Sequence, residues 1–174
     1  MVASEPTPRD EIELRSKIIA EALEWKFTPY HYRPAATARA IAGLKGVGAD
    51  CLTFMVGVYY NVGLVGDITI PFYRRDFMIH NYRRDIVGGE VEESYLEGVL
   101  GYGREVETPL PGDVVLYRFR EGQIFAHGGI VLNWPMIIHC FIGRFGVIEA
   151  DGTQGRHTGV ERKFISAFPL KEVC

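Results

Sequence analysis

Residues 122–143 read GQIFAHGGIVLNWPMIIHCFIG, a run of 22 residues with no Asp, Glu, Lys or Arg. That length is sufficient for one bilayer crossing. The run also contains two histidines, a Gly-Gly pair and Pro135, which a transmembrane helix does not readily accommodate. Its apolar segments 130–132 and 136–138 are separated by the turn-forming residues 133–135. The stretch therefore predicts a buried β-hairpin and argues against membrane insertion.

The predicted hairpin carries His127 on its first strand and His139 on its second. If the loop comprises residues 133–135, Leu132 pairs with Met136. The two histidines then lie diagonally adjacent on one face of the hairpin. A two-residue loop would place them on opposite faces, so the arrangement depends on the register.

Short apolar runs flank the hairpin on both sides. Upstream, the turn residues 111–113 precede VVLY at 114–117. Downstream, residues 145–148 form another apolar run before the Asp-Gly pair at 151–152. The C-terminal half of the chain is therefore expected to form an antiparallel β-meander.

Two helices are expected in the N-terminal half. Apolar residues recur at helical spacing over residues 10–25, among charged residues typical of an amphipathic helix. Residues 51–60 have the length and apolarity of a buried helix, and Asp50 is suited to be its N-cap. Cys51 would then be the first helical residue, where the helix dipole and free N–H groups favour a thiolate.

The composition indicates one globular domain without a global cationic field. The chain has 174 residues, 47% hydrophobic, and a formal net charge of -3, so neither nucleic acid nor an anionic membrane is an expected partner. Residues 1–9 are expected to be a flexible arm without a signal-peptide core. We expect residues 10–174 to form a single domain with an insertion at about 66–108. That insertion contains four arginines: Arg74, Arg75, Arg83 and Arg84.

The cysteines at 51, 140 and 174 include no CxxC pair, so no disulfide framework is indicated. Cys140 follows His139 on the predicted strand and is expected to point to the opposite face, into the core. A cysteine at a helix start, a histidine base and a polar group that orients the imidazole are the elements of cysteine-peptidase chemistry. A zinc site built from the two histidines and a cysteine is the metal alternative. No HExxH motif supports it, so neither a metal nor a cofactor is expected.

Four motifs, in this order, resemble those of the NlpC-type cell-wall peptidases. They are GADC at 48–51, PGDVVLY at 111–117, AHGGI at 126–130 and MIIH at 136–139. More narrowly, TPY at 28–30 followed by GVGADCL at 46–52 resembles the branch found in tailed bacteriophages and phage-like particles. The resemblance extends over about residues 12–150.

This resemblance implies a papain-like α+β fold, with N-terminal helices packed on a central antiparallel sheet. It implies hydrolysis of amide bonds in peptidoglycan stem peptides, commonly the bond from D-glutamate to the diamino acid. Cys51 would be the nucleophile, His127 the general base and His139 the orienting residue. Tyr30 matches a tyrosine that lines the site and assists the oxyanion. Asp50 matches the aspartate before the cysteine, either as N-cap alone or also in contact with the amino end of the substrate.

The resemblance also implies a location and partners. The expected enzyme is made in the bacterial cytoplasm, is carried on a phage tail or phage-like particle beside tail-tip or baseplate proteins, and acts in the host cell envelope. Most members of the family have Ser-Gly after the cysteine, whereas this chain has Leu52 and Thr53, and the bulkier Thr53 would crowd the helix or narrow the cleft. A catalytically weak or inactive structural tail-tip subunit is therefore the alternative. A lipid acyltransferase is a third hypothesis, disfavoured because relatives of that kind have a permuted order.

Overall fold

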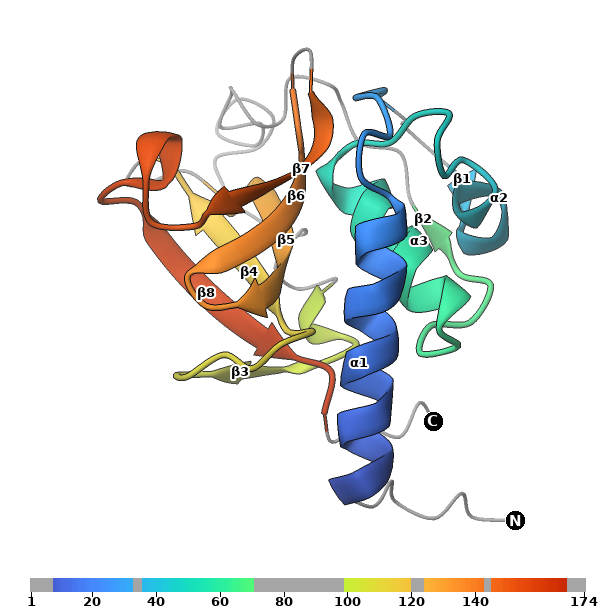
Figure 1. Cartoon of the computed structure of the whole chain (residues 1–174), viewed down its shortest axis with the longest axis horizontal. Coiled ribbons are helices and arrows are strands. Elements are labelled where there is room, and N and C mark those ends of the chain that lie inside the picture. Colours follow the sequence, from blue (N-terminus) through green and yellow to red (C-terminus); the bar gives the residue numbers. More distant parts are fainter. Residues whose placement is uncertain (1–7, 33–35, 71–98, 120–123, 143–144, 169–174) are drawn as a thin grey trace, which may run out of the picture.

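The computed structural model describes residues 8–32, 36–70, 99–119, 124–142 and 145–168 (Figure 1). This part of the chain contains helices, strands and a 3-10 turn. In chain order they are α1 (Pro8–Glu24), β1 (Ala36–Thr37), α2 (Ala38–Ala42), α3 (Cys51–Asn61), β2 (Thr69–Ile70), β3 (Arg104–Val106), β4 (Val114–Arg118), β5 (His127–Asn133), β6 (Met136–Phe141), β7 (Gly146–Asp151), η1 (Gly155–His157) and β8 (Glu161–Ser166). The helices expected over 10–25 and 51–60 correspond to α1 and α3.

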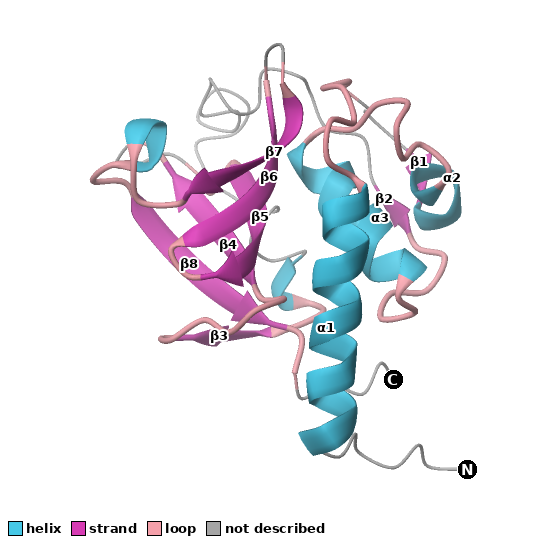
Figure 2. Cartoon of the chain, in the orientation of Figure 1, coloured by secondary structure: helices cyan, strands magenta, loops and turns pink. Residues whose placement is uncertain are grey.

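The central sheet has the strand order β3-β8-β4-β5-β6-β7, and its neighbouring strands pair antiparallel. Strands β4 to β7 follow one another as the expected meander, and β8 returns to pair with β4. The helices α1, α2 and α3 lie together on one side of this sheet (Figure 2). The predicted α+β class, with N-terminal helices packed on a central antiparallel sheet, is confirmed.

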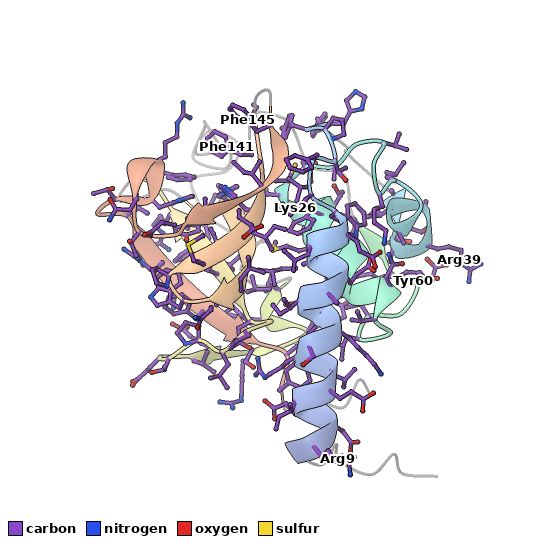
Figure 3. All side chains as sticks on the ribbon, viewed as in Figure 1. Arg9, Lys26, Arg39, Tyr60, Phe141 and Phe145 are labelled. Atoms are coloured by element: carbon purple, nitrogen blue, oxygen red, sulfur yellow. The ribbon has the colours of Figure 1, made fainter. Side chains whose placement is uncertain are left out.

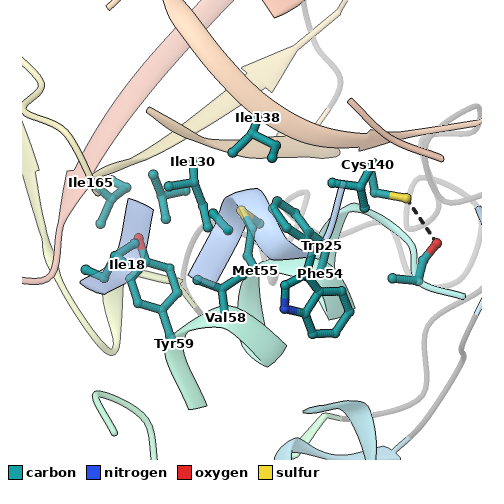
Figure 4. Packing of buried hydrophobic residues seen from close by; sticks show 14 of the residues in the cluster. Ile18, Trp25, Phe54, Met55, Val58, Tyr59, Ile130, Ile138, Cys140 and Ile165 are labelled. Carbon is teal, nitrogen blue, oxygen red and sulfur yellow. Dashed lines mark hydrogen bonds between the residues drawn. The ribbon is translucent and has the colours of Figure 1, made fainter. Parts of the chain in front are cut away.

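The main core lies between the sheet and the helices α1 and α3. Trp25 and Phe54 meet edge to face, with ring centroids 5.9 Å apart, and both are fully buried. Ile130 of β5 and Ile138 of β6 point into the same cluster from the sheet (Figure 4). A Cβ at Gly57 would lie 2.6 Å from the Trp25 ring, so glycine there allows α3 to approach the aromatic side chain. At the surface, Lys26 pairs with Glu149 of β7 (Figure 3).

The uncharged window forms the β5–β6 hairpin, as predicted. Ile130 pairs with Ile138 and Val131 with Ile137, which is the register of the three-residue loop. The expected pairing of Leu132 with Met136 is wrong, because Asn133 pairs with Met136 and the register shifts between Val131 and Asn133. The irregularity leaves one extra residue, Leu132, in the first strand. The turn therefore has two residues, and the two histidines still lie on one face of the hairpin. Within the described residues, no helix is long and apolar enough to cross a membrane.

A buried ion pair joins α1 to the loop before β4. Nη1 of Arg15 lies 2.8 Å from Oδ1 of Asp113 and donates a 2.7 Å hydrogen bond to the carbonyl oxygen of Pro111. Nη2 donates to Oγ of Ser166 at 3.1 Å, and Nε donates to Glu11 at 2.8 Å. These residues are called the arginine cluster below. Together they fix α1 to the loop before β4 and to the last residue of β8.

The same loop, before β4, also contacts α3. Oη of Tyr59 donates a 2.7 Å hydrogen bond to the carbonyl oxygen of Gly112, and the N–H of Leu110 donates to Oδ2 of Asp113 at 2.8 Å. Gly112 has φ of 86°, a backbone conformation that favours glycine. The Pro-Gly-Asp turn that precedes β4 is therefore a docking point for two helices.

Some expectations fall on residues outside the described ranges. Residues 1–7 of the expected arm, residues 71–98 of the expected insertion and Cys174 are among them. The four arginines of the insertion lie in the same undescribed segment. The domain boundaries therefore stay predictions.

Candidate active site

The first turn of α3 is fixed by a reciprocal cap. Oδ1 of Asp50 accepts a 2.9 Å hydrogen bond from the N–H of Thr53, and Oγ1 of Thr53 accepts one of 2.9 Å from the N–H of Asp50. This capping box makes Cys51 the first helical residue, as expected from the sequence. The cysteine is buried, with 4% of its surface exposed. Its position in the first turn of a helix, where the helix dipole favours a thiolate, suits a nucleophile.

Thr53 therefore has a structural reason to replace a smaller residue. Its side chain is 1% exposed and its Oγ1 also lies 3.0 Å from Oδ1 of Asp50. The hydroxyl group satisfies a donor that the helix start would otherwise leave open. The side chain of Thr53 thus contacts Asp50, the N-cap of the helix that carries Cys51.

Tyr30 lies beside this helix start. Its backbone forms a parallel bridge with that of Ala49, two residues before Cys51. The N–H of Ala49 donates to the carbonyl oxygen of Pro29 at 3.0 Å. The N–H of His31 donates to the carbonyl oxygen of Ala49 at 2.7 Å. The structure therefore brings the predicted site residue Tyr30 to the nucleophile end of α3.

His127 and His139 form a direct pair across the β5–β6 hairpin. Nε2 of His127 lies 2.8 Å from Nδ1 of His139, and the ring planes are inclined by 71°. A Cβ at Gly129 would lie 2.9 Å from Cβ of His139, so the glycine leaves the space that the second imidazole needs. Phe141 lies at the end of β6 (Figure 3). It packs edge-on against His127 with ring centroids 6.2 Å apart. The predicted shared face of the two histidines is confirmed.

A third histidine, which the sequence reasoning did not single out, joins this pair. His157 belongs to η1, and its ring centroid is 5.2 Å from that of His139 and 5.9 Å from that of His127. Tyr117 of β4 stacks on His157 with a centroid distance of 4.4 Å. His127, His139 and His157 are called the histidine cluster below, and all three are buried. No local sequence motif identifies His157 as a site residue, because the turn that follows β7 brings it to the cluster.

Burial keeps the cluster neutral. It lowers the pKa of His127 well below the ordinary value, and the charges of His139 and His157 lower it further. Burial and the charge of His157 also lower the pKa of His139 to about 3. Burial lowers the pKa of His157, although a hydrogen bond to the backbone of Asp151 acts in the opposite direction. Neutral imidazoles at pH 7 offer a lone pair, which is the state required of a general base or a metal ligand.

The cysteine end of α3 and the histidine cluster meet the same strand. The Cys140 thiol donates a 3.1 Å hydrogen bond to the carbonyl oxygen of Ala49, next to the start of α3 (Figure 4). Burial raises the pKa of Cys140, and the nearby Cys51 and Asp50 raise it further. Since Cys140 follows His139, β6 contacts the thiol-bearing helix end and the imidazole pair at consecutive residues. The expected core position of Cys140 is confirmed.

No family model matches this chain, and no curated protein matches it either. Among solved structures, it is similar to the crystal structure of the NlpC/p60 domain of the peptidoglycan hydrolase SagA. The TM-score is 0.50 and the sequence identity is 21%, and the match covers 87% of this chain and 97% of that one. The likeness shows that this chain has the papain-like fold of an NlpC/p60 domain.

Proposed function

We propose that this chain is a cysteine peptidase that hydrolyses amide bonds in the stem peptides of peptidoglycan. The observation that carries the proposal is the state of His127. Its Nε2 is paired with His139, whereas its buried Nδ1 has no hydrogen-bond partner among the described residues. If Nε2 donates to His139, Nδ1 holds the free lone pair of the ring. A buried and neutral nitrogen of this kind is suited to accept a thiol proton.

In the proposed reaction, Sγ of Cys51 bonds to the carbonyl carbon of the scissile amide, and its proton passes to Nδ1 of His127. The C–N bond then breaks, and the leaving nitrogen takes the proton from His127. A thioester on Cys51 remains. Water attacks this thioester while His127 accepts a proton again. The C–S bond then breaks, the acid is released, and the proton on His127 returns to Sγ of Cys51. His139 holds the imidazole in orientation throughout.

The oxyanion that forms during attack needs hydrogen-bond donors. Backbone N–H groups at the start of α3 are suitable, because the capping box fixes the direction of the first helical turn before substrate binds. Tyr30, whose backbone is bridged to Ala49, is assigned the supporting role that the motif resemblance implies. Asp50 is the observed N-cap and is assigned, in addition, a contact with the amino end of the substrate.

The substrate class rests on two supports. The fold is that of a domain from a peptidoglycan hydrolase, and the four sequence motifs resemble those of cell-wall peptidases. The finer assignments rest on the motifs alone. They are cleavage between D-glutamate and the diamino acid, and carriage on the tail of a phage or phage-like particle beside tail-tip proteins.

The direct test is digestion of purified stem peptides, with products identified by mass spectrometry. The wild-type protein and the Cys140→Ala variant should both release the expected fragments. The Cys51→Ala variant should release none, because covalent catalysis loses its nucleophile. Equal digestion by Cys51→Ala would refute the assignment.

Thiol alkylation distinguishes an active peptidase from a structural subunit that retains only the fold. At pH 7, Cys51 should react with iodoacetamide at least about tenfold faster than Cys140, because the thiolate is the reactive form and burial raises the pKa of Cys140. Peptide mapping of the native protein after short exposures measures both rates in one sample. Equal rates at the two cysteines would favour the structural alternative.

A further inference from the structure

The histidine cluster contains one more imidazole than the proposed reaction uses. His127 is assigned as base and His139 as its orienting partner, which leaves His157 without a role. One ring nitrogen from each of the three residues can be chosen so that all three lie within 4.8 Å of one another. All three side chains are buried, with exposed fractions of 1%, 2% and 4% in chain order.

The unused hydrogen-bonding capacity of this cluster points to a ligand. Nε2 of His157 is buried, has no partner among the described residues and has no part in the proposed reaction. Buried polar atoms are normally satisfied, so this nitrogen requires an explanation. In a neutral imidazole, a ring nitrogen without a proton has a lone pair available for coordination.

The surroundings of His157 are those of a coordinating imidazole. Its hydrogen bond to the backbone of Asp151 leaves Nε2 as the nitrogen with the free lone pair. A ligating histidine commonly uses its second nitrogen in this way, because the hydrogen bond fixes the tautomer and the ring orientation. The ring of Tyr117 stacks on the ring of His157, with centroids 4.4 Å apart, and limits its rotation.

The spacing is close to that of a tetrahedral site. Zinc binds histidine nitrogen at about 2.0–2.1 Å, which places tetrahedral ligand atoms roughly 3.3 Å apart. Three nitrogens within 4.8 Å therefore need to approach by roughly 1.5 Å at most.

We propose that His127, His139 and His157 form a binding site for one divalent transition-metal ion, with Zn²⁺ as the ion best suited to three neutral imidazoles. The ligand set contains no cysteine, unlike the zinc alternative considered from the sequence. The fourth coordination position is left to water or another small ligand.

Metal binding and catalysis would exclude each other, a consequence that rests on the proposed function. A neutral imidazole has one lone pair, so His127 cannot coordinate a metal and accept the proton of Cys51 at the same time. Zinc should therefore inhibit hydrolysis, and a chelator should restore it. The site would make the proposed peptidase sensitive to metal in its surroundings.

The test measures metal binding without substrate, so its outcome is independent of peptidase activity. Tag-free protein is titrated with ZnCl₂ at pH 7.5 by calorimetry, and metal content is measured after dialysis. We expect one zinc ion per chain. His157→Gln and His139→Gln should each weaken binding at least about tenfold. The matched control is His31→Gln, which removes an exposed histidine outside the cluster and should leave the affinity unchanged.

Cobalt provides a second readout of the ligands. Co²⁺ in the site should give the visible absorption of a tetrahedral ion without a thiolate-to-cobalt charge-transfer band. Thermal unfolding with and without zinc shows whether each variant is folded, and the zinc-dependent rise in Tm should disappear in His157→Gln. Absence of binding, unchanged affinity in His157→Gln, or a thiolate band would each overturn the proposal. Zinc binding by a Cys51→Ala protein that still digests stem peptides would refute the peptidase function and leave the metal site intact.

Discussion

Two buried polar clusters lie at opposite ends of β4, and they differ in how completely their atoms are paired. Asp113 of the arginine cluster immediately precedes the strand, whereas Tyr117 near its other end pairs with His127. In the arginine cluster, the three guanidinium nitrogens of Arg15 and both carboxylate oxygens of Asp113 have partners within 3.1 Å. In the histidine cluster, two ring nitrogens have none among the described residues.

This difference separates a polar group that holds the fold from one that is available for chemistry. A fully paired buried network stabilises the arrangement that pairs it, and removing one member leaves a charge or donor exposed to an apolar interior. An unpaired lone pair contributes little to stability but can accept a proton or bind a metal. Variants at the two clusters should therefore affect different properties.

The largest effect is expected on activity at His127. His127→Gln keeps a side chain of similar size but removes the base, so the rate of stem-peptide hydrolysis should fall by about 10²–10⁴. The free energy of unfolding should change by only about 1 kcal/mol, because the glutamine amide can replace Nε2 in the hydrogen bond to His139 and the lost Nδ1 makes no hydrogen bond within the described residues. Steady-state kinetics and urea denaturation of the same preparation measure both quantities. Near-normal activity would remove His127 from the proposed mechanism.

At the arginine cluster the expected effect is on stability. Asp113→Ala leaves the Arg15 guanidinium buried without its carboxylate, which should cost about 3–5 kcal/mol of unfolding free energy. Hydrolysis per folded molecule should change little. The double variant Arg15→Met/Asp113→Leu removes both charges and should recover much of the loss. A single variant as stable as the wild type would show that the paired network does not hold α1.

The sequence predicted the elements whose causes are local. Asp50 and the apolar run after it were sufficient to place the start of α3 at Cys51, and the turn residues were sufficient to identify the β5–β6 hairpin. The irregularity at Leu132 was not predicted, since it depends on how the two strands fit together.

The clusters themselves depend on contacts between distant segments. Arg15 and Asp113 are 98 positions apart, and the sequence showed only a charged helix face and a turn. His157 reaches its partners through the turn after β7, so its place beside His127 could not be seen from spacing alone. Of the candidate site, the positions of the two paired histidines were predictable and the third was not.

A smaller effect is expected from Tyr59, whose hydroxyl group belongs to the paired end of the molecule. Burial raises its pKa above the ordinary value of 10.0, and the charge of Asp113 raises it further. The stabilising contribution of this group is therefore complete below pH 10 and is lost as the pH rises above it, since the unfolded chain releases the proton first. The loss can reach about 1.4 kcal/mol per pH unit.

The Tyr59→Phe variant tests this sign. At pH 7 it should be less stable than the wild type by about 1 kcal/mol, because the carbonyl oxygen of Gly112 loses its donor. Between pH 10 and 11 the difference should shrink, since the variant has no phenol to ionise. Urea unfolding at pH 7, 10 and 11 measures the difference. Parallel pH profiles for the two proteins would contradict the prediction.

The smallest effect is expected at Asp50, which is a paired group at the reactive end of the molecule. Asp50→Ala removes the N-cap and should cost about 1 kcal/mol of unfolding free energy, whereas Asp50→Asn keeps a capping oxygen and should cost only a few tenths of a kcal/mol.

The Asp50→Asn variant distinguishes the two proposed roles of Asp50, because it keeps the cap but removes the charge. If the carboxylate also contacts the amino end of the substrate, Asp50→Asn should raise KM about fivefold for a stem peptide with a free amino group. KM for the same peptide with an acetylated amino end should be unchanged by the substitution. Equal KM values for both peptides in wild type and variant would restrict Asp50 to its role as the cap of α3.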